Sequence, residues 1–133
     1  MGHFKKNGYT LLELIVVISI MALLIAGGVA TYSSLMKQSR DGRRKADLEN
    51  IRSALEMYRS NNGFYPAALS TLTAPTIYIK SVPADPRSPT YTYYYTGSSS
   101  DYTLGAYLET PGTDSCGNCT IGVCNYCMGP YGK

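Results

Sequence analysis

The feature that most constrains this chain of 133 residues is a run of apolar residues close to its amino terminus. The run covers Leu11–Ala30 and is interrupted only by Glu13, Ser19 and the pair Gly27-Gly28. A helix of about twenty residues, at ~1.5 Å per residue, crosses the roughly 30 Å hydrocarbon core of a bilayer. We therefore predict a helix that is apolar all round and needs lipid, or other copies of itself, to cover it.

Two simpler interpretations of this run stay open. One is a secretory signal peptide, because Ala26-Gly27-Gly28 imitates the small-residue cleavage site of such signals. An ordinary signal peptide has a shorter apolar region, however. The other is a plain transmembrane anchor with no further role.

The helical pattern does not stop where the apolar run ends. Leu48, Ile51, Leu55 and Tyr58 recur at spacings of three and four, which marks one apolar face. No proline occurs between Tyr9 and Tyr65, so we predict one continuous helix from about Thr10 to about Ser60. Its first half is hydrophobic and its second half is amphipathic. On the polar faces we expect two stabilising pairs four residues apart, Asp41–Lys45 and Arg52–Glu56.

The chain after this helix predicts a small antiparallel sheet, which makes the fold class α+β. Tyr91–Tyr95 and Tyr102–Leu108 are rich in residues that favour strands, and the polar segment Gly97–Asp101 between them predicts a hairpin. We also expect one helical turn within Pro66–Leu72 and the start of a strand at Ile77–Ile79. The amphipathic half of the helix would pack on this sheet.

The segment Lys6-Asn7-Gly8-Tyr9-Thr10-Leu11-Leu12-Glu13, followed by the apolar run, carries the strongest motif in the sequence. It resembles the processing motif of type IV pilins and type II secretion pseudopilins. The resemblance implies that a prepilin peptidase cuts after Gly8 and methylates the new amino terminus at Tyr9. Residues 1–8 are then a leader peptide, and Glu13 becomes the fifth mature residue, where the family carries a glutamate.

Glu13 stands out on physical grounds as well. A carboxylate in an apolar helix is costly to bury without a partner, and such residues usually serve a function. Cleavage after Gly8 would create a positively charged amino terminus that can meet Glu13 of a neighbouring copy in a stack of parallel helices, and so fix the step between subunits. The alternatives are that Glu13 reaches water at the membrane surface, or pairs with the amino terminus of its own chain.

Charge distribution alone does not set the orientation of this helix in a membrane. Lysines 5 and 6 precede the apolar run, whereas the positions after it carry a larger basic cluster, formed by Lys37, Arg40, Arg43, Arg44 and Lys45. The positive-inside rule would place that larger cluster in the cytoplasm. The opposite orientation, with the leader in the cytoplasm, follows from the resemblance.

The resemblance extends into the globular part. Asn62-Gly63-Phe64-Tyr65-Pro66 is similar to the sequence that follows the long helix of many pilins, and Pro83-Ala84-Asp85-Pro86 is similar to a segment of major pseudopilins. It implies three parts: the leader 1–8, a transmembrane and filament-core part 9–35, and a pilin-like globular domain 36–133. Major pseudopilins also bind calcium through a C-terminal loop, but the tail after Glu109 offers only Asp114, so no calcium site is expected.

All four cysteines lie in the tail 114–133, as Cys116, Cys119, Cys124 and Cys127. Two C-x-x-C pairs can hold one Zn²⁺, but an extracytoplasmic location favours disulfides. Three pairings are possible, and the nested one, Cys119–Cys124 inside Cys116–Cys127, needs an irregular turn because a regular ladder cannot hold both bridges on one face. Disulfides and a zinc site therefore both stay open, and either would tie down a tail that has little to bury.

The function expected from these features is structural. The single histidine, His3, lies in the leader, which leaves no base for a Ser or Cys nucleophile, so no enzyme activity and no cofactor are expected. The main prediction is a subunit of a type IV pilus-like helical filament, and the alternative is a major pseudopilin of a type II secretion system. A more distant alternative is a membrane-anchored zinc-binding module. Expected partners are copies of the chain, prepilin peptidase and an inner-membrane assembly platform. The subunit would reside in the cytoplasmic membrane before joining an extracellular pilus or periplasmic pseudopilus.

Overall fold

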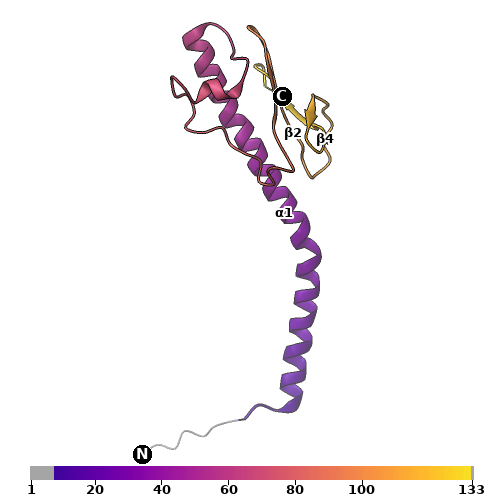
Figure 1. Cartoon of the computed structure of the whole chain (residues 1–133). Helices are drawn as coiled ribbons and strands as arrows, with labels where there is room; N and C mark the ends of the chain where they lie inside the picture. Colours follow the sequence, from indigo (N-terminus) through magenta and orange to yellow (C-terminus); the bar gives the residue numbers. More distant parts are fainter. Residues whose placement is uncertain (1–7, 133) are drawn as a thin grey trace, which may run out of the picture. The chain divides into compact units, whose positions relative to one another are not determined.

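The computed structural model describes residues 8–132, except for the side chains of residues 29 and 30. The chain forms two compact units, Met1–Met36 and Lys37–Lys133. One long helix, α1 (Leu11–Asn62), contributes its first half to one unit and its second half to the other (Figure 1). The predicted helix, Thr10 to Ser60, is therefore confirmed to within two residues at each end.

The described part of the first unit is the apolar half of α1. Its large hydrophobic side chains are all exposed, from Leu11 at 74% to Met36 at 41%. Within the described residues, α1 is the one helix with a stretch long and apolar enough to cross a membrane, and none of that stretch is buried. This half of the helix has no core of its own.

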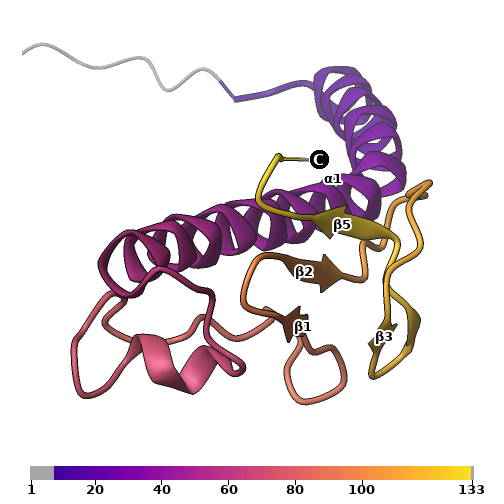
Figure 2. The ribbon, with the colours of Figure 1, turned by 90° about the horizontal axis from the view of Figure 1, so that it is seen from above.

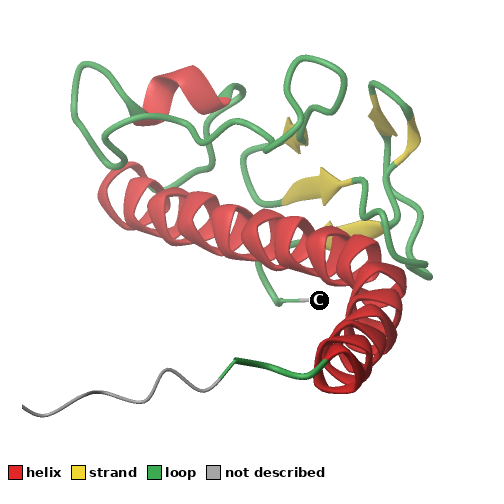
Figure 3. Cartoon of the chain, turned by 90° about the horizontal axis from the view of Figure 1, so that it is seen from below, coloured by secondary structure: helices red, strands yellow, loops and turns green. Residues whose placement is uncertain are grey.

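The second unit packs the amphipathic half of α1 on a three-stranded antiparallel sheet (Figures 2 and 3). The strands are β1 (Tyr94–Gly97), β2 (Tyr102–Ala106) and β5 (Tyr126–Met128), in the order β1-β2-β5. A separate two-stranded sheet is formed by β3 (Asn118–Cys119) and β4 (Gly122–Val123), and a 3₁₀ turn, η1, covers Leu69–Leu72. The α+β architecture predicted from the sequence is confirmed.

The core lies between α1 and the sheet. Leu48, Ile51 and Leu55 of the helix are completely buried, and Leu104 of β2 is equally inaccessible. Alternate residues of β2 point into this core because successive side chains of a strand face opposite sides. The burial of Leu72 in η1 brings the segment after the helix into the same cluster.

The strand expected at Ile77–Ile79 is absent. The amides of Tyr78 and Ile79 both donate to the carbonyl oxygen of Leu72, at 2.9 and 3.2 Å, which folds this segment back onto the end of η1. Two neighbouring amides that share one acceptor cannot form a strand ladder. The hairpin is present, but its first strand begins at Tyr94 rather than at Tyr91.

The two polar pairs expected on α1 are also wrong. Asp41 is 4% exposed and pairs with Arg44 instead of Lys45. Arg52 lies 3.5 Å from Glu49, while Glu56 accepts hydrogen bonds from the hydroxyls of Tyr65 and Tyr102. Both carboxylates also accept hydrogen bonds from residues outside the helix, and Asp41 and Arg52 pair three residues away instead of four.

Truncation of Ile51 should measure how much this core contributes to stability. Ile51→Ala removes a fully buried side chain and should lower the free energy of unfolding by about 2–4 kcal/mol, from lost burial and the cavity left behind. Met57→Ala on the same helix is the control, because Met57 is 50% exposed and should cost well under half as much. Urea unfolding of the detergent-solubilised protein, followed by near-ultraviolet circular dichroism of the tyrosines, makes the measurement. Equal losses in the two variants would contradict this packing.

Candidate functional site

The start of α1 carries the residues predicted for processing and assembly. Gly8, Tyr9 and Thr10 precede the first helical residue and are exposed, so the Gly8–Tyr9 peptide bond is not held in helical hydrogen bonding. An added Cβ at Gly8 would meet no atom within 4 Å. The rest of the predicted leader, residues 1–7, lies outside the described residues. Cleavage at Gly8 and methylation of Tyr9 stay predictions.

Thr10 caps the helix, a role that was not among the sequence predictions. Its Oγ1 accepts a hydrogen bond of 3.2 Å from the backbone N–H of Glu13, and its carbonyl oxygen accepts the first helical bond from Leu14. Thr10-x-x-Glu13 is the sequence pattern of a capping box, which would have located this helix start. A carboxylate in the first turn also interacts favourably with the helix dipole. Glu13 thus contributes to the helix start within its own chain.

The surroundings of the Glu13 side chain are apolar and open. A shallow groove of about 300 Å³ at the start of α1 is lined by Tyr9, Glu13, Leu14 and Val17. Among the described residues, none contributes a cation to an ion pair with Glu13. A carboxylate exposed among apolar side chains can accept a positively charged group brought by another molecule.

A buried ion network lies at the beginning of the second unit. Arg44 is fully buried, and its guanidinium donates to both oxygens of Asp85, at 2.6 and 3.1 Å, which is a bidentate pair. Its Nη1 also donates to Asp41 at 2.6 Å and to Glu109 at 3.1 Å. One side chain of α1 thereby joins the loop around Asp85 to the segment after β2.

The carboxylates of this network accept hydrogen bonds from several different groups. Asp41 accepts hydrogen bonds from the backbone amides of Glu109 and Thr110, each at 2.9 Å, and from the Thr110 hydroxyl at 2.7 Å. Glu109 receives a bidentate pair of 2.6 Å bonds from Arg40. No buried side-chain polar atom in the described part of the chain lacks a partner. That completeness is required of buried charges, because an unpaired one is strongly destabilising.

The network shifts the pKa values of Glu109 and Arg44. Hydrogen bonds from Arg40 and then Arg44 lower the pKa of Glu109 to about 2, although burial opposes the shift. Burial also disfavours the charged form of Arg44, but hydrogen bonds to Asp85, Asp41 and Glu109 outweigh it, and the pKa of Arg44 is raised. These groups stay ionised at neutral pH.

The sequence contains a signal for this network. The apolar stripe Leu48, Ile51 and Leu55 continues backwards at the same spacing of three and four through Arg44 and Asp41. Charged residues that fall on the buried face of an amphipathic helix must find partners inside the fold. Asp85, in the segment that is similar to major pseudopilins, is the partner of Arg44.

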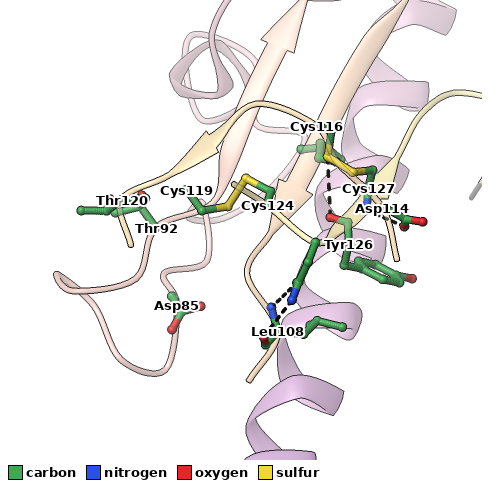
Figure 4. Close-up of a disulfide and its surroundings, with 12 residues drawn as sticks. Asp85, Thr92, Leu108, Asp114, Cys116, Cys119, Thr120, Cys124, Tyr126 and Cys127 are labelled. Carbon is green, nitrogen blue, oxygen red and sulfur yellow. Dashed lines mark hydrogen bonds between the residues drawn. A yellow bond between two sulfur atoms is a disulfide. The ribbon is translucent and has the colours of Figure 1, made fainter. Parts of the chain in front are cut away.

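The four cysteines form two nested disulfides, Cys116–Cys127 and Cys119–Cys124 (Figure 4). The inner pair closes the β3–β4 hairpin, and both of its residues are buried. The outer pair is half-buried and connects the approach to β3 with β5 in the other sheet. Because the two bridges do not share one ladder, the geometric objection to nested pairing does not arise.

Glycine at position 105 makes room for both bridges. A Cβ added there would lie 3.0 Å from the sulfur of Cys124 and 3.1 Å from that of Cys116. The irregular turn required for nesting occurs at Gly117, whose φ of +65° is unfavourable for other residues. The disulfides therefore pack directly over the middle strand of the sheet.

Side-chain hydrogen bonds also attach the tail to the rest of the globular unit. Asn125 accepts from the amide of Leu108 at 2.6 Å and donates to its carbonyl oxygen at 3.0 Å, which extends the pairing beyond β5. Asp114 accepts from the amide of Cys127, and the hydroxyls of Thr92 and Thr120 lie 2.5 Å apart (Figure 4). The tail is joined to the sheet and to the preceding loop at several points.

The cysteine tail does not form the zinc site that the sequence left open. Its four thiolates are replaced by two disulfide bonds, and the described residues include no group of three or more His, Cys, Asp or Glu side chains placed to hold a metal ion. The tail is fastened covalently instead.

Two family models match the chain. The prokaryotic N-terminal methylation motif matches residues 3–29, and type II secretion system protein G matches residues 32–117, which is more than half of the chain. The chain belongs to the type II secretion system protein G family. Among solved structures, none matches the chain significantly.

Individual members of the protein G family agree with this assignment. Type II secretion system core protein G of Pseudomonas aeruginosa is 31% identical, over 86% of this chain and 94% of that protein. The proteins of the same name from Escherichia coli and Vibrio cholerae are each 30% identical, over 75% and 77% of this chain. The resemblance to pseudopilins is confirmed, and the secretion alternative is better supported than the surface pilus, which is only the broader family.

The ion network of this protein G family member should be essential to its globular unit. Arg44→Met leaves three buried carboxylates short of a partner and should lower the free energy of unfolding by about 3–5 kcal/mol. Arg43→Met is the matched control, because the adjacent Arg43 is exposed and its loss should cost less than about 1 kcal/mol. Urea unfolding of both variants is the measurement. Unchanged stability of Arg44→Met would refute the role given to the network.

The two disulfides should differ in accessibility. Mild reduction followed by alkylation of the folded protein should modify Cys116 and Cys127 before Cys119 and Cys124, because the inner pair is at most 1% exposed. Peptide mass spectrometry identifies the modified residues, and the same treatment in denaturant is the control, in which the order should vanish. Early modification of Cys119 together with Cys116 would contradict the nested pairing.

Proposed function

We propose that this chain is the major structural subunit of a type II secretion pseudopilus. The leader is removed after Gly8, Tyr9 becomes the methylated amino terminus, and the apolar half of α1 packs with copies of itself in the filament core. The globular unit forms the outer layer. The match of the protein G family model over residues 32–117 is the observation that carries this proposal.

The exposure of the first unit supports assembly through the helix. Side chains such as Leu12 at 72% and Leu23 at 75% have no cover within the described chain. A stretch apolar on all sides is stable only in lipid or against other apolar surfaces. The subunit therefore resides in the cytoplasmic membrane first and exchanges lipid for neighbouring helices when the filament forms in the periplasm.

Glu13 sets the position of each subunit along the filament axis relative to its neighbour. The positively charged amino terminus created at Tyr9 meets Glu13 of an adjacent subunit, in the open groove formed with Leu14 and Val17. An ion pair in apolar surroundings is favourable only when the two charges are closely matched, so copies displaced along the helix axis are rejected. Prepilin peptidase and an inner-membrane assembly platform are the partners that this pathway requires.

A charge-neutral substitution at Glu13 tests the proposal. Glu13→Gln keeps the backbone hydrogen bond to Thr10, so processing should continue, and mass spectrometry should find a mature chain that begins at methylated Tyr9. Filament yield should fall roughly tenfold or more, because the amino terminus then lacks its counter-charge in an apolar setting. Sedimentation of sheared filaments measures the yield.

Glu13→Asp is the control, since it retains the charge and should recover part of the assembly. Normal filaments from Glu13→Gln would refute the pairing. Filaments built from chains that keep residues 1–8 would refute the processing step, and a protein that works without assembling would refute the proposed function as a whole.

A further inference from the structure

The beginning of the second unit presents exposed cations on α1. Lys37, Arg43 and Lys45 are exposed, and none of them belongs to an ion pair within the described chain. Lys45 lies 5.4 Å from the ring of Tyr126, a contact that leaves its positive charge unneutralised. These three positive charges lie within nine residues of the chain, and an external anion could neutralise them.

Three carboxylates of the network beside these cations are buried in the fold. Asp41 and Asp85 are 4% and 6% exposed, and the Glu109 side chain is 6% exposed. All three are held by Arg44, and Glu109 also by Arg40. The buried network therefore leaves the exposed charges of residues 37–46 entirely positive.

The place of these cations along the chain indicates what they meet. Tyr9, just before α1, and Tyr32 are 80% and 64% exposed, and a helix over the 22 residues between them would rise ~35 Å. Tyrosines at both ends of an apolar span are typical of residues at the two membrane surfaces. Lys37 follows Tyr32 by only five residues, so the cations begin at the depth of the lipid headgroups.

We propose that Lys37, Arg43 and Lys45 bind anionic phospholipid headgroups at the membrane surface on the globular side, before the subunit is assembled. This inference rests on the membrane residence in the proposed function. Ammonium and guanidinium groups form charge-assisted hydrogen bonds with phosphate, and basic residues next to a membrane span are attracted to anionic lipid. Release of these headgroups is then one of the steps by which the subunit leaves the membrane.

A second copy of the chain is a poorer partner for this surface. Of the carboxylates that remain exposed in the globular unit, Glu49 pairs with Arg52, and Asp101 accepts a 2.7 Å hydrogen bond from the amide of Tyr102. Asp101 keeps its negative charge, but this one carboxylate cannot match three cations. An anionic membrane surface contains many phosphate groups at the depth of the headgroups, and the lipids that carry them can move to reach these cations.

The test uses the full chain in nanodiscs of equal parts phosphatidylglycerol and phosphatidylcholine. Native mass spectrometry of the released protein counts the lipids of each kind that stay bound. The wild type should retain phosphatidylglycerol preferentially, and high salt should reduce the preference. Each cation near an anionic surface contributes about fivefold to binding, so the variant K37Q/R43Q should lose most of the enrichment.

The matched control is K80Q/R52Q, which removes the same formal charge from residues that lie farther along the chain from the span. It should retain lipid like the wild type, as should the charge-preserving variant K37R/R43K. Circular dichroism verifies that all variants are folded. Unchanged enrichment in K37Q/R43Q, or an equal loss in K80Q/R52Q, would overturn the inference.

Two further outcomes separate this inference from the proposed function. If K37Q/R43Q binds lipid normally but forms no filaments, the cations contact another subunit, and the lipid inference fails while the filament role stands. If the wild-type chain does not insert into nanodiscs at all, both the inference and the proposed membrane residence fail.

Discussion

The fold of the globular unit depends on how Arg44 is accommodated. A guanidinium without solvent contact is tolerated only because three carboxylates from separate segments surround it, one from α1 itself, one from the Asp85 loop and one from the segment after β2. Those two segments have little regular secondary structure and would otherwise have few reasons to adopt one position. A bidentate pair fixes orientation as well as distance, so Arg44 determines where the Asp85 loop crosses the helix.

The same arrangement explains how a small unit remains ordered. Small domains bury a modest share of their surface, so the core formed by Leu48, Ile51, Leu55 and the sheet leaves its margins poorly supported. The ion network holds the Asp85 loop and the segment after β2 against α1, and the two disulfides hold the tail. Hydrogen bonds of Glu56 with Tyr65 and Tyr102 join the helix to the remaining edge. These polar contacts add to the stability that hydrophobic burial provides.

Sequence patterns predicted the regular elements well and the irregular contacts poorly. The helix followed from apolar spacing and the absence of proline, and the hairpin followed from strand-forming residues around a polar turn. Asp41 and Glu56 were misassigned because spacing along a helix reveals possible local partners but not competing tertiary ones. The strand expected at Ile77–Ile79 fails for a similar reason, since its amides are taken by Leu72. At the start of α1 the predicted residues are exposed and adjacent, but the partner proposed for Glu13 belongs to another molecule, which a single chain cannot reveal.

The covalent closure at Cys116 and Cys127 changes how the sheet can open. β5 has only three residues, and a strand so short, at the edge of a sheet, would ordinarily fray by itself. Because its middle residue is bonded to position 116, it cannot depart without carrying the intervening segment, whose inner bridge packs on β2. The last strand is therefore expected to open together with the segment from position 116 rather than by itself, and this would protect those β2 amides that pair with β5 from exchange with solvent.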